Sequence, residues 1–151
     1  MKSKVKVIRK PKKAISRLNH LSKNMSGPNK VRVGLPKDSN AYPDGTSVVM
    51  VGIVHEFGNP SNNIPQRSFI RTGIRENKRA YKRLFRSLTR KIIDGKMDKH
   101  TALELIGLQA QTDIRQKITD LKLPPLKNRQ GNPLIDTGHM RQSVTYEVDK
   151  K

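Results

Sequence analysis

The spacing of apolar residues changes at about residue 75, and this change restricts the fold more than any other feature of the chain. Before it, residues 31–35 alternate apolar with basic or small residues, a period of two that is typical of a strand. After it, apolar residues recur at helical spacing up to Gly95, and again up to Leu121. This change from a period of about two to one of about 3.6 predicts an α+β protein.

Three segments are expected to form a small antiparallel sheet. Residues 31–35 form the first, and residues 144–148, which also alternate, form the last. Residues 47–57 are rich in Val and Ile in nearly continuous order, which favours a strand that is largely buried. We expect two longer helices to pack on this sheet.

Helix boundaries follow from Pro, Gly and polar residues. A short basic helix is predicted over about residues 12–25, with Pro11 at its start and Gly27 just after its end. The first longer helix is expected from Arg75 and is closed by Gly95. The second is expected over 99–121, where Thr101 and Glu104 have the spacing of a capping box.

Positive charge dominates the chain. It has 32 Lys and Arg against 12 Asp and Glu, a formal net charge of +20, and only 33% hydrophobic residues. The sequence divides into a basic N-terminal arm and short helix, residues 1–30, and an α+β domain, residues 31–151. Because like charges oppose compaction, we expect an acidic partner or neighbouring subunits to complete the stability of the protomer.

Several classes of protein have no support in the sequence. It contains no cysteine, which excludes disulfides and thiolate zinc sites, and no apolar run long enough to span a membrane. No apolar signal-peptide core follows the basic N-terminus. Glycine-rich nucleotide-binding loops are lacking, and the four histidines form no metal-binding pattern. We expect neither a metal nor another cofactor.

One triplet, Asp136-Thr137-Gly138, invites comparison with aspartic proteases. Such enzymes need a second aspartate that shares a proton with the first, and a long β-structure after the triplet, whereas this triplet lies near the C-terminus. We expect instead that Asp136 or Thr137 caps a turn or short helix. Ser143 has no histidine paired with it in a catalytic motif, so an enzyme is not expected.

The basic residues are the remaining signal of a binding surface. The helix after Ile74 carries seven Lys or Arg on one face, and only Glu76 opposes them. Such a surface favours contact with phosphates without reading of bases. The candidate contacts with nucleic acid or an acidic partner are Lys2, Lys4, Lys6, Arg9, Lys10, Lys12, Lys13, Lys78, Lys82 and Arg86.

Three short sequence motifs, which we call phrases, occur in this order: Val-His-Glu-Phe-Gly at 54–58, Ile-Pro-Gln-Arg-Ser-Phe-Ile-Arg at 64–71 and Pro-Leu-Ile-Asp-Thr-Gly-His-Met-Arg-Gln-Ser-Val at 133–144. Together they resemble a family of neck or tail-completion proteins of long-tailed bacteriophages. The resemblance covers roughly residues 30–148. It implies structural or interface roles for His55, Glu56, Phe57, Gly58, Pro65, Arg67, Phe69, Arg71, Asp136, Thr137, Gly138 and Ser143.

The resemblance also implies a setting for the positive charge. Such proteins act as rings between the head connector and the tail, through which duplex DNA passes, and we expect a ring of six copies here. The chain would then be made in the host cytoplasm and located in the virion, with DNA, connector and tail proteins as partners and without a membrane. Two alternatives stay open: a tail terminator that caps the tail tube, and a non-specific nucleic-acid-binding protein outside any virion.

Overall fold

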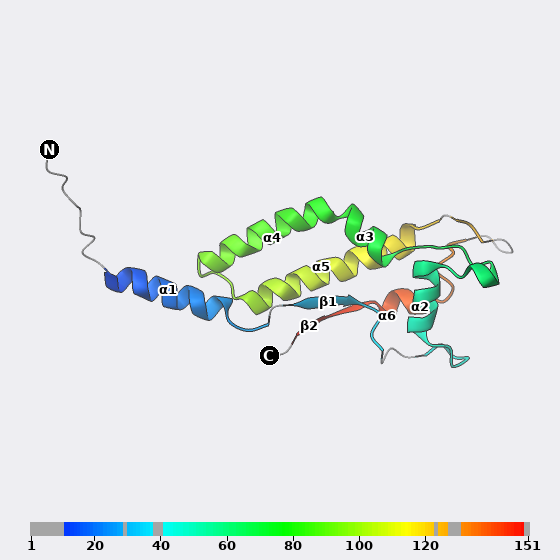
Figure 1. The fold of residues 1–151 in the computed structure, drawn as a ribbon, viewed down its shortest axis with the longest axis horizontal. Coiled ribbons are helices and arrows are strands. Elements are labelled where there is room, and N and C mark those ends of the chain that lie inside the picture. Colours follow the sequence, from blue (N-terminus) through cyan, green and yellow to red (C-terminus); the bar gives the residue numbers. More distant parts are fainter. Residues whose placement is uncertain (1–10, 29, 38–40, 123, 127–130, 150–151) are drawn as a thin grey trace.

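Helix α5 forms the axis of an elongated α+β fold (Figure 1). The computed structural model describes residues 11–28, 30–37, 41–122, 124–126 and 131–149. Helix α4 lies along one side of α5 and the strands lie along the other, while α1 extends from one end and α2 and α6 occupy the opposite end (Figure 1). The elements are α1 (Pro11–Met25), β1 (Val31–Gly34), α2 (Val48–Phe57), η1 (Pro60–Asn62), α3 (Ile70–Glu76), α4 (Lys78–Ile93), α5 (Lys99–Asp120), α6 (His139–Ser143) and β2 (Thr145–Val148).

The two strands pair antiparallel along α5. Their register places Val31 opposite Val148 and Gly34 opposite Thr145. Helix α5 approaches the pair closely at Gly107, where any side chain would collide with the ring of Tyr146. The predicted strands 31–35 and 144–148 are therefore confirmed, and so is the α+β class.

The predicted strand at 47–57 is wrong, because this segment forms helix α2. The side-chain oxygen of Ser47 accepts a hydrogen bond from the N–H of Met50 at the start of the helix. At its end, Gly58 has a φ of +78° and its N–H donates to the carbonyl of Val54 at 2.7 Å. A nearly continuous apolar run has neither a period of two nor one of 3.6, so these polar caps decide the structure.

Other helix boundaries agree with the sequence in part. Helix α1 begins at Pro11, and Gly95 follows α4 with a φ of +71°, both as expected. The single helix expected from Arg75 is instead two helices, α3 and α4, which meet at Asn77. The capping box at Thr101 is also wrong, because Asp98 caps α5 by accepting a hydrogen bond from the N–H of Thr101 at 2.9 Å.

A first core cluster joins α2, α5, α6 and the start of α3. The ring of Phe69 lies at its centre and has 0% of its surface exposed. The buried members of this cluster are Val48, Phe69, Ile114, Ile118, Leu134, Met140 and Val144. Segments that lie far apart in the sequence therefore share one core.

Replacing Phe69 by alanine is expected to lower the free energy of unfolding by about 3 kcal/mol, because the change leaves a cavity in this cluster. The matched control is Phe85→Ala, since the Phe85 side chain on α4 is largely exposed. We expect that control to change stability by less than about 1 kcal/mol. Urea unfolding followed by circular dichroism compares the two variants, and equal losses would contradict the packing described here.

A second core cluster holds α1 to the body of the protein. It consists of Leu88 and Ile92 from α4 with Ala102 and Ile106 from α5. Leu21 of α1 packs against it, as does Val31 of β1. The C-terminal half of α1 thus joins the fold, while its N-terminal half extends beyond α4 (Figure 1).

Candidate functional site

The carboxylate of Glu56, at the end of α2, is buried and binds the segment that leads into α3. The residue has 5% of its surface exposed. One carboxylate oxygen accepts a hydrogen bond from the hydroxyl of Ser68 at 2.7 Å. The backbone N–H groups of Phe69, Ile70 and Arg71 donate to the carboxylate at 2.9, 2.9 and 3.2 Å. Glu56 therefore caps the start of α3 from another helix, and we call these five residues the Glu56 cluster.

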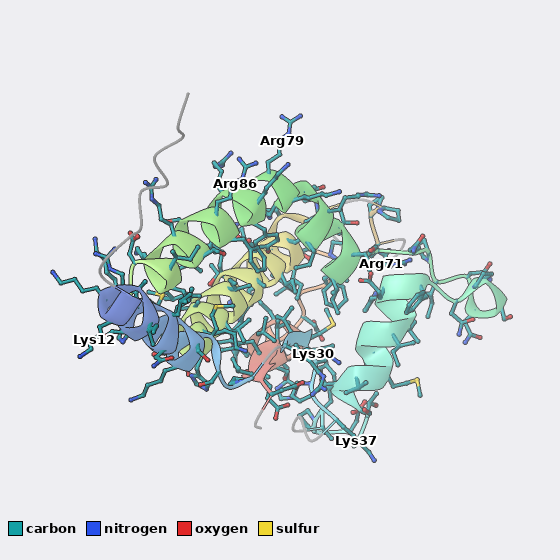
Figure 2. The ribbon with its side chains drawn as sticks, turned by 60° about the vertical axis from the view of Figure 1, so that its left-hand side comes forward. Lys12, Lys30, Lys37, Arg71, Arg79 and Arg86 are labelled. Carbon is teal, nitrogen blue, oxygen red and sulfur yellow. The ribbon has the colours of Figure 1, made fainter. Side chains whose placement is uncertain are left out.

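The side chain of Arg71 completes this cluster. Its Nε donates to the carboxylate of Glu56 at 2.8 Å, and its Nη2 donates to the backbone carbonyl of Glu56 at 3.0 Å. The guanidinium also lies 4.7 Å from the centre of the Phe57 ring, a cation–π contact. Figure 2 shows Arg71 between α3 and the end of α2. Arg71, the last residue of the second phrase, thus contacts both Glu56 and Phe57 of the first phrase.

The hydrogen bonds of the cluster outweigh the effect of burial on Glu56. Burial raises the pKa of its carboxyl, but the hydrogen bonds from Ser68, Arg71 and the backbone of Ile70 together lower the pKa below its ordinary value. A lowered pKa in the folded state means that the ionised form stabilises the fold at neutral pH. The stability that Glu56 contributes is present above the unfolded pKa of about 4.3 and is lost as the pH falls below it.

Arg67 is buried inside the protomer and holds a second loop. It has 5% of its surface exposed. Its Nε donates to the carbonyl of Pro124 at 2.9 Å and its Nη2 to that of Pro125 at 3.2 Å. Its backbone N–H donates to the carbonyl of His55 at 2.7 Å. Burial and the nearby charge of Arg67 lower the pKa of His55, which favours its neutral form.

Arg67→Ala is expected to destabilise the protomer by about 2 kcal/mol, because the carbonyls of Pro124 and Pro125 lose a buried, charged donor. Arg67→Lys should fall between this variant and the wild type, since an ammonium carries charge but not the planar fork of donors. Chemical unfolding of the purified chain measures both. A normal stability together with failed assembly would instead place Arg67 at a subunit contact, the other role that the sequence left open.

The third phrase forms the turn into α6. The hydroxyl of Thr137 accepts a hydrogen bond from the N–H of His139 at 3.3 Å, and Gly138 has a φ of +79°. The hydroxyl of Ser143 donates to the carbonyl of His139 at 2.9 Å. Asp136 is exposed near Tyr42, and Tyr42 stacks edge-on against His139. Thr137 therefore accepts one N–H within the turn, whereas the N-cap position of α6 is taken by Gly138 and has no side-chain cap.

The three phrases converge on one end of the molecule. Glu56 binds the backbone of the second phrase, Phe69 of the second phrase packs with Met140 and Val144 of the third, and α2 contacts α6. Pro65 is exposed in the loop between α2 and α3. Within the described residues, no group of three His, Asp or Glu side chains is placed to hold a metal ion. No helix in the described ranges is long and apolar enough to cross a membrane.

The outer face of α4 carries the densest positive charge of the described chain. Residues 78–93 contain no Asp or Glu. We call its exposed basic residues the α4 ridge: Lys78, Arg79, Lys82, Arg83, Arg86, Arg90 and Lys91. Figure 2 shows Arg79 and Arg86 pointing away from the body of the protein. Among the described residues, no carboxylate lies within ion-pairing distance of the ridge.

Five of the ten candidate contacts lie in the described residues, and they divide between two places. Lys78, Lys82 and Arg86 lie together on the α4 ridge, whereas Lys12 and Lys13 are on α1, at one end of the molecule. Lys2, Lys4, Lys6, Arg9 and Lys10 lie outside the described residues. The structure thus places Arg79, Arg83, Arg90 and Lys91, the other basic residues of this helix face, beside them on the α4 ridge.

Comparison with protein-family models, with curated proteins and with solved structures found no match to this chain.

Sequence reasoning missed two features of the site. Ser68 and Gln66 also bind Glu56, through a hydroxyl and through a side-chain amide that donates to its backbone carbonyl at 3.0 Å. The acid itself was a signal, because Glu56 lies in a mostly apolar segment that was expected to be buried. The second feature is the outer apolar face of α2. It was missed because residues 47–57 were predicted to form a buried strand, which has no exposed face.

Proposed function

We propose that this chain is a structural protein of the neck of a long-tailed bacteriophage. Copies of it form a ring, of six subunits by the resemblance, at the joint between head and tail. The ring joins or completes the two parts around the channel through which the DNA passes. The proposal includes no catalytic step, and Glu56, Asp136 and Ser143 have structural roles in it.

The convergence of the three phrases is the observation that carries this proposal. Motifs that match a family by chance have no reason to meet in space. Here Glu56 of the first phrase caps the second phrase, and Phe69 of the second shares a core with Met140 of the third. A domain inherited from a common ancestor would keep these three phrases in contact, as they are in this structure.

The α4 ridge supports a place beside DNA in this proposal. A ridge of seven basic residues without ion-pair partners in the described chain is suited to contact with phosphates, which carry no base sequence. The same ridge favours a second candidate, a nucleic-acid-binding protein outside any virion. That candidate accounts for the charge but not for the three ordered phrases.

Deletion of the gene in its phage or prophage tests the proposed function. We expect filled heads and separate tails that do not join, counted by electron microscopy, and joining restored by the gene supplied in trans. Portal, capsid and tail-tube genes are expected nearby in the genome. Joined, infectious particles in the deletion strain would contradict the neck role and favour the second candidate.

A further inference from the structure

Helix α2 is apolar on all sides, but the protomer covers only one of them. Its only polar side chains belong to His55 and Glu56. On the opposite side, Met50, Ile53 and Phe57 are 58%, 47% and 62% exposed. Their spacing puts them on one face, which we call the α2 stripe. A helix that is apolar all round is normally buried all round, so this face is expected to be covered by a partner.

A second apolar stripe lies on α1. Ile15 and Leu18 are 55% and 65% exposed, and we call them the α1 stripe. They continue the face on which Leu21 packs against the second core cluster. Because α1 extends past the end of α4 (Figure 1), no described element covers this part of it. The same helix face thus begins in the core of the protomer and continues outside it.

The two stripes lie at opposite ends of an elongated molecule, so they cannot cover each other within one chain (Figure 1). A contact between different surfaces of identical copies covers both stripes at once. A two-fold contact between two α2 stripes would leave the α1 stripes exposed. We infer that the α1 stripe of one copy packs against the α2 stripe of the next copy.

The α2 end carries both signs of charge, with exposed Lys37 and Arg71 as well as two acids, and the acids offer partners to the basic helix α1. The described part of α1 has exposed Lys12, Lys13, Arg17 and Lys23 and no acid. The α2 end carries the exposed carboxylates of Asp44 and Asp136. Both lie close to Tyr42, where burial and these two charges raise the pKa of its hydroxyl. A basic helix therefore meets an end of the molecule on which exposed acids are present.

Repetition of such a contact produces a closed ring if the rotation closes, and a filament if it does not. The inference names the contact within the proposed ring, and to that extent it rests on the proposed function. An apolar contact between like-charged copies also predicts how their association depends on salt. Because copies with a net charge of +20 repel one another, salt should strengthen this association by screening the repulsion.

Sedimentation velocity of the full chain tests the inference at about 0.5 M salt, where charges are screened beyond a few Å. The wild type is expected to form oligomers larger than a dimer. Leu18→Asp and Ile53→Asp should each weaken association by about a hundredfold or more, as loss of an interface centre does. Ile15→Asp and Met50→Asp are second variants of the same stripes. Ser16→Asp and Ser61→Asp add the same charge at exposed positions outside the stripes and should associate like the wild type.

Mixing the variants gives the sharpest result. A Leu18→Asp copy keeps its α2 stripe and an Ile53→Asp copy keeps its α1 stripe, so an equal mixture should form one-to-one dimers and nothing larger. A Leu18→Asp variant that dimerises alone, or a mixture that stays monomeric, would overturn the inference. Wild-type rings that persist in both variants would overturn this contact and leave the neck role standing. A wild type that stays monomeric under these conditions would overturn the contact, whereas the neck role is decided by particle joining.

Discussion

Glu56→Ala is expected to lower the free energy of unfolding by about 4 kcal/mol, because it leaves several buried or partly buried donors without a partner. The hydroxyl of Ser68 and the N–H groups of Phe69 and Ile70 all point at the carboxylate that this change removes. Arg71, which is partly exposed, would lose its partner as well. The cost therefore comes mainly from the unpaired backbone at the start of α3.

Glu56→Gln removes the charge of this side chain but keeps its shape. The amide keeps one acceptor oxygen but turns its NH2 group toward donors, so we expect a loss of about 2 kcal/mol or more. Urea unfolding at pH 7 measures both variants. Between pH 7 and pH 3 the wild type should lose stability as its carboxylate is protonated, and Glu56→Gln should lose less over the same range. A Glu56→Gln variant as stable as the wild type at pH 7 would contradict the role given to the carboxylate.

Neutralising four residues of the α4 ridge is expected to weaken the binding of duplex DNA roughly a thousandfold near 0.1 M salt, if all four contact phosphate. The variant combines Lys78→Gln, Lys82→Gln, Arg83→Gln and Arg86→Gln. Each phosphate contact contributes about 0.9 to the slope of log affinity against log salt, so the slope should fall by about 3.6. Binding by the wild type should not depend on DNA sequence, because phosphates carry no base information.

A matched variant controls for net charge. Lys30, Lys37, Lys96 and Lys122 are exposed and lie outside α4, and their replacement by Gln removes the same charge. Fluorescence anisotropy with a labelled duplex across a salt series compares the three proteins. We expect the control to keep most of the wild-type slope. Equal losses in both variants would show that total charge, rather than the ridge, binds DNA, and salt-insensitive binding would contradict the phosphate contact itself.

The sequence predicted the parts of the fold in which the spacing of apolar residues agrees with the residues that begin and end helices and strands. The strands 31–35 and 144–148 alternate cleanly, and the segment of α5 has apolar residues at helical spacing up to Leu121. It failed for α2, because Val and Ile favour strands while caps at Ser47 and Gly58 favour a helix. Propensity is a weak preference, and packing of Val48 in the core overrides it.

The sequence predicted which residues belong to the candidate site, but not how they are arranged in space. The phrases identified Glu56, Arg67, Phe69 and Arg71, yet nothing in their spacing showed that the carboxylate caps α3 from another helix. Such a cap depends on a contact between residues 14 positions apart through a loop whose path the sequence does not specify. The outer stripe of α2 was hidden for a related reason, since a buried strand has no exposed face.

Cryo-electron microscopy of the purified phage particle that encodes this chain tests the neck role most directly. The proposal predicts a ring of copies of this fold at the joint between head and tail, surrounding the channel through which the DNA passes. The map would also show which neighbours contact α1 and α2. A particle whose neck density is fully accounted for by other proteins, with this chain absent from the particle, would contradict the proposed function.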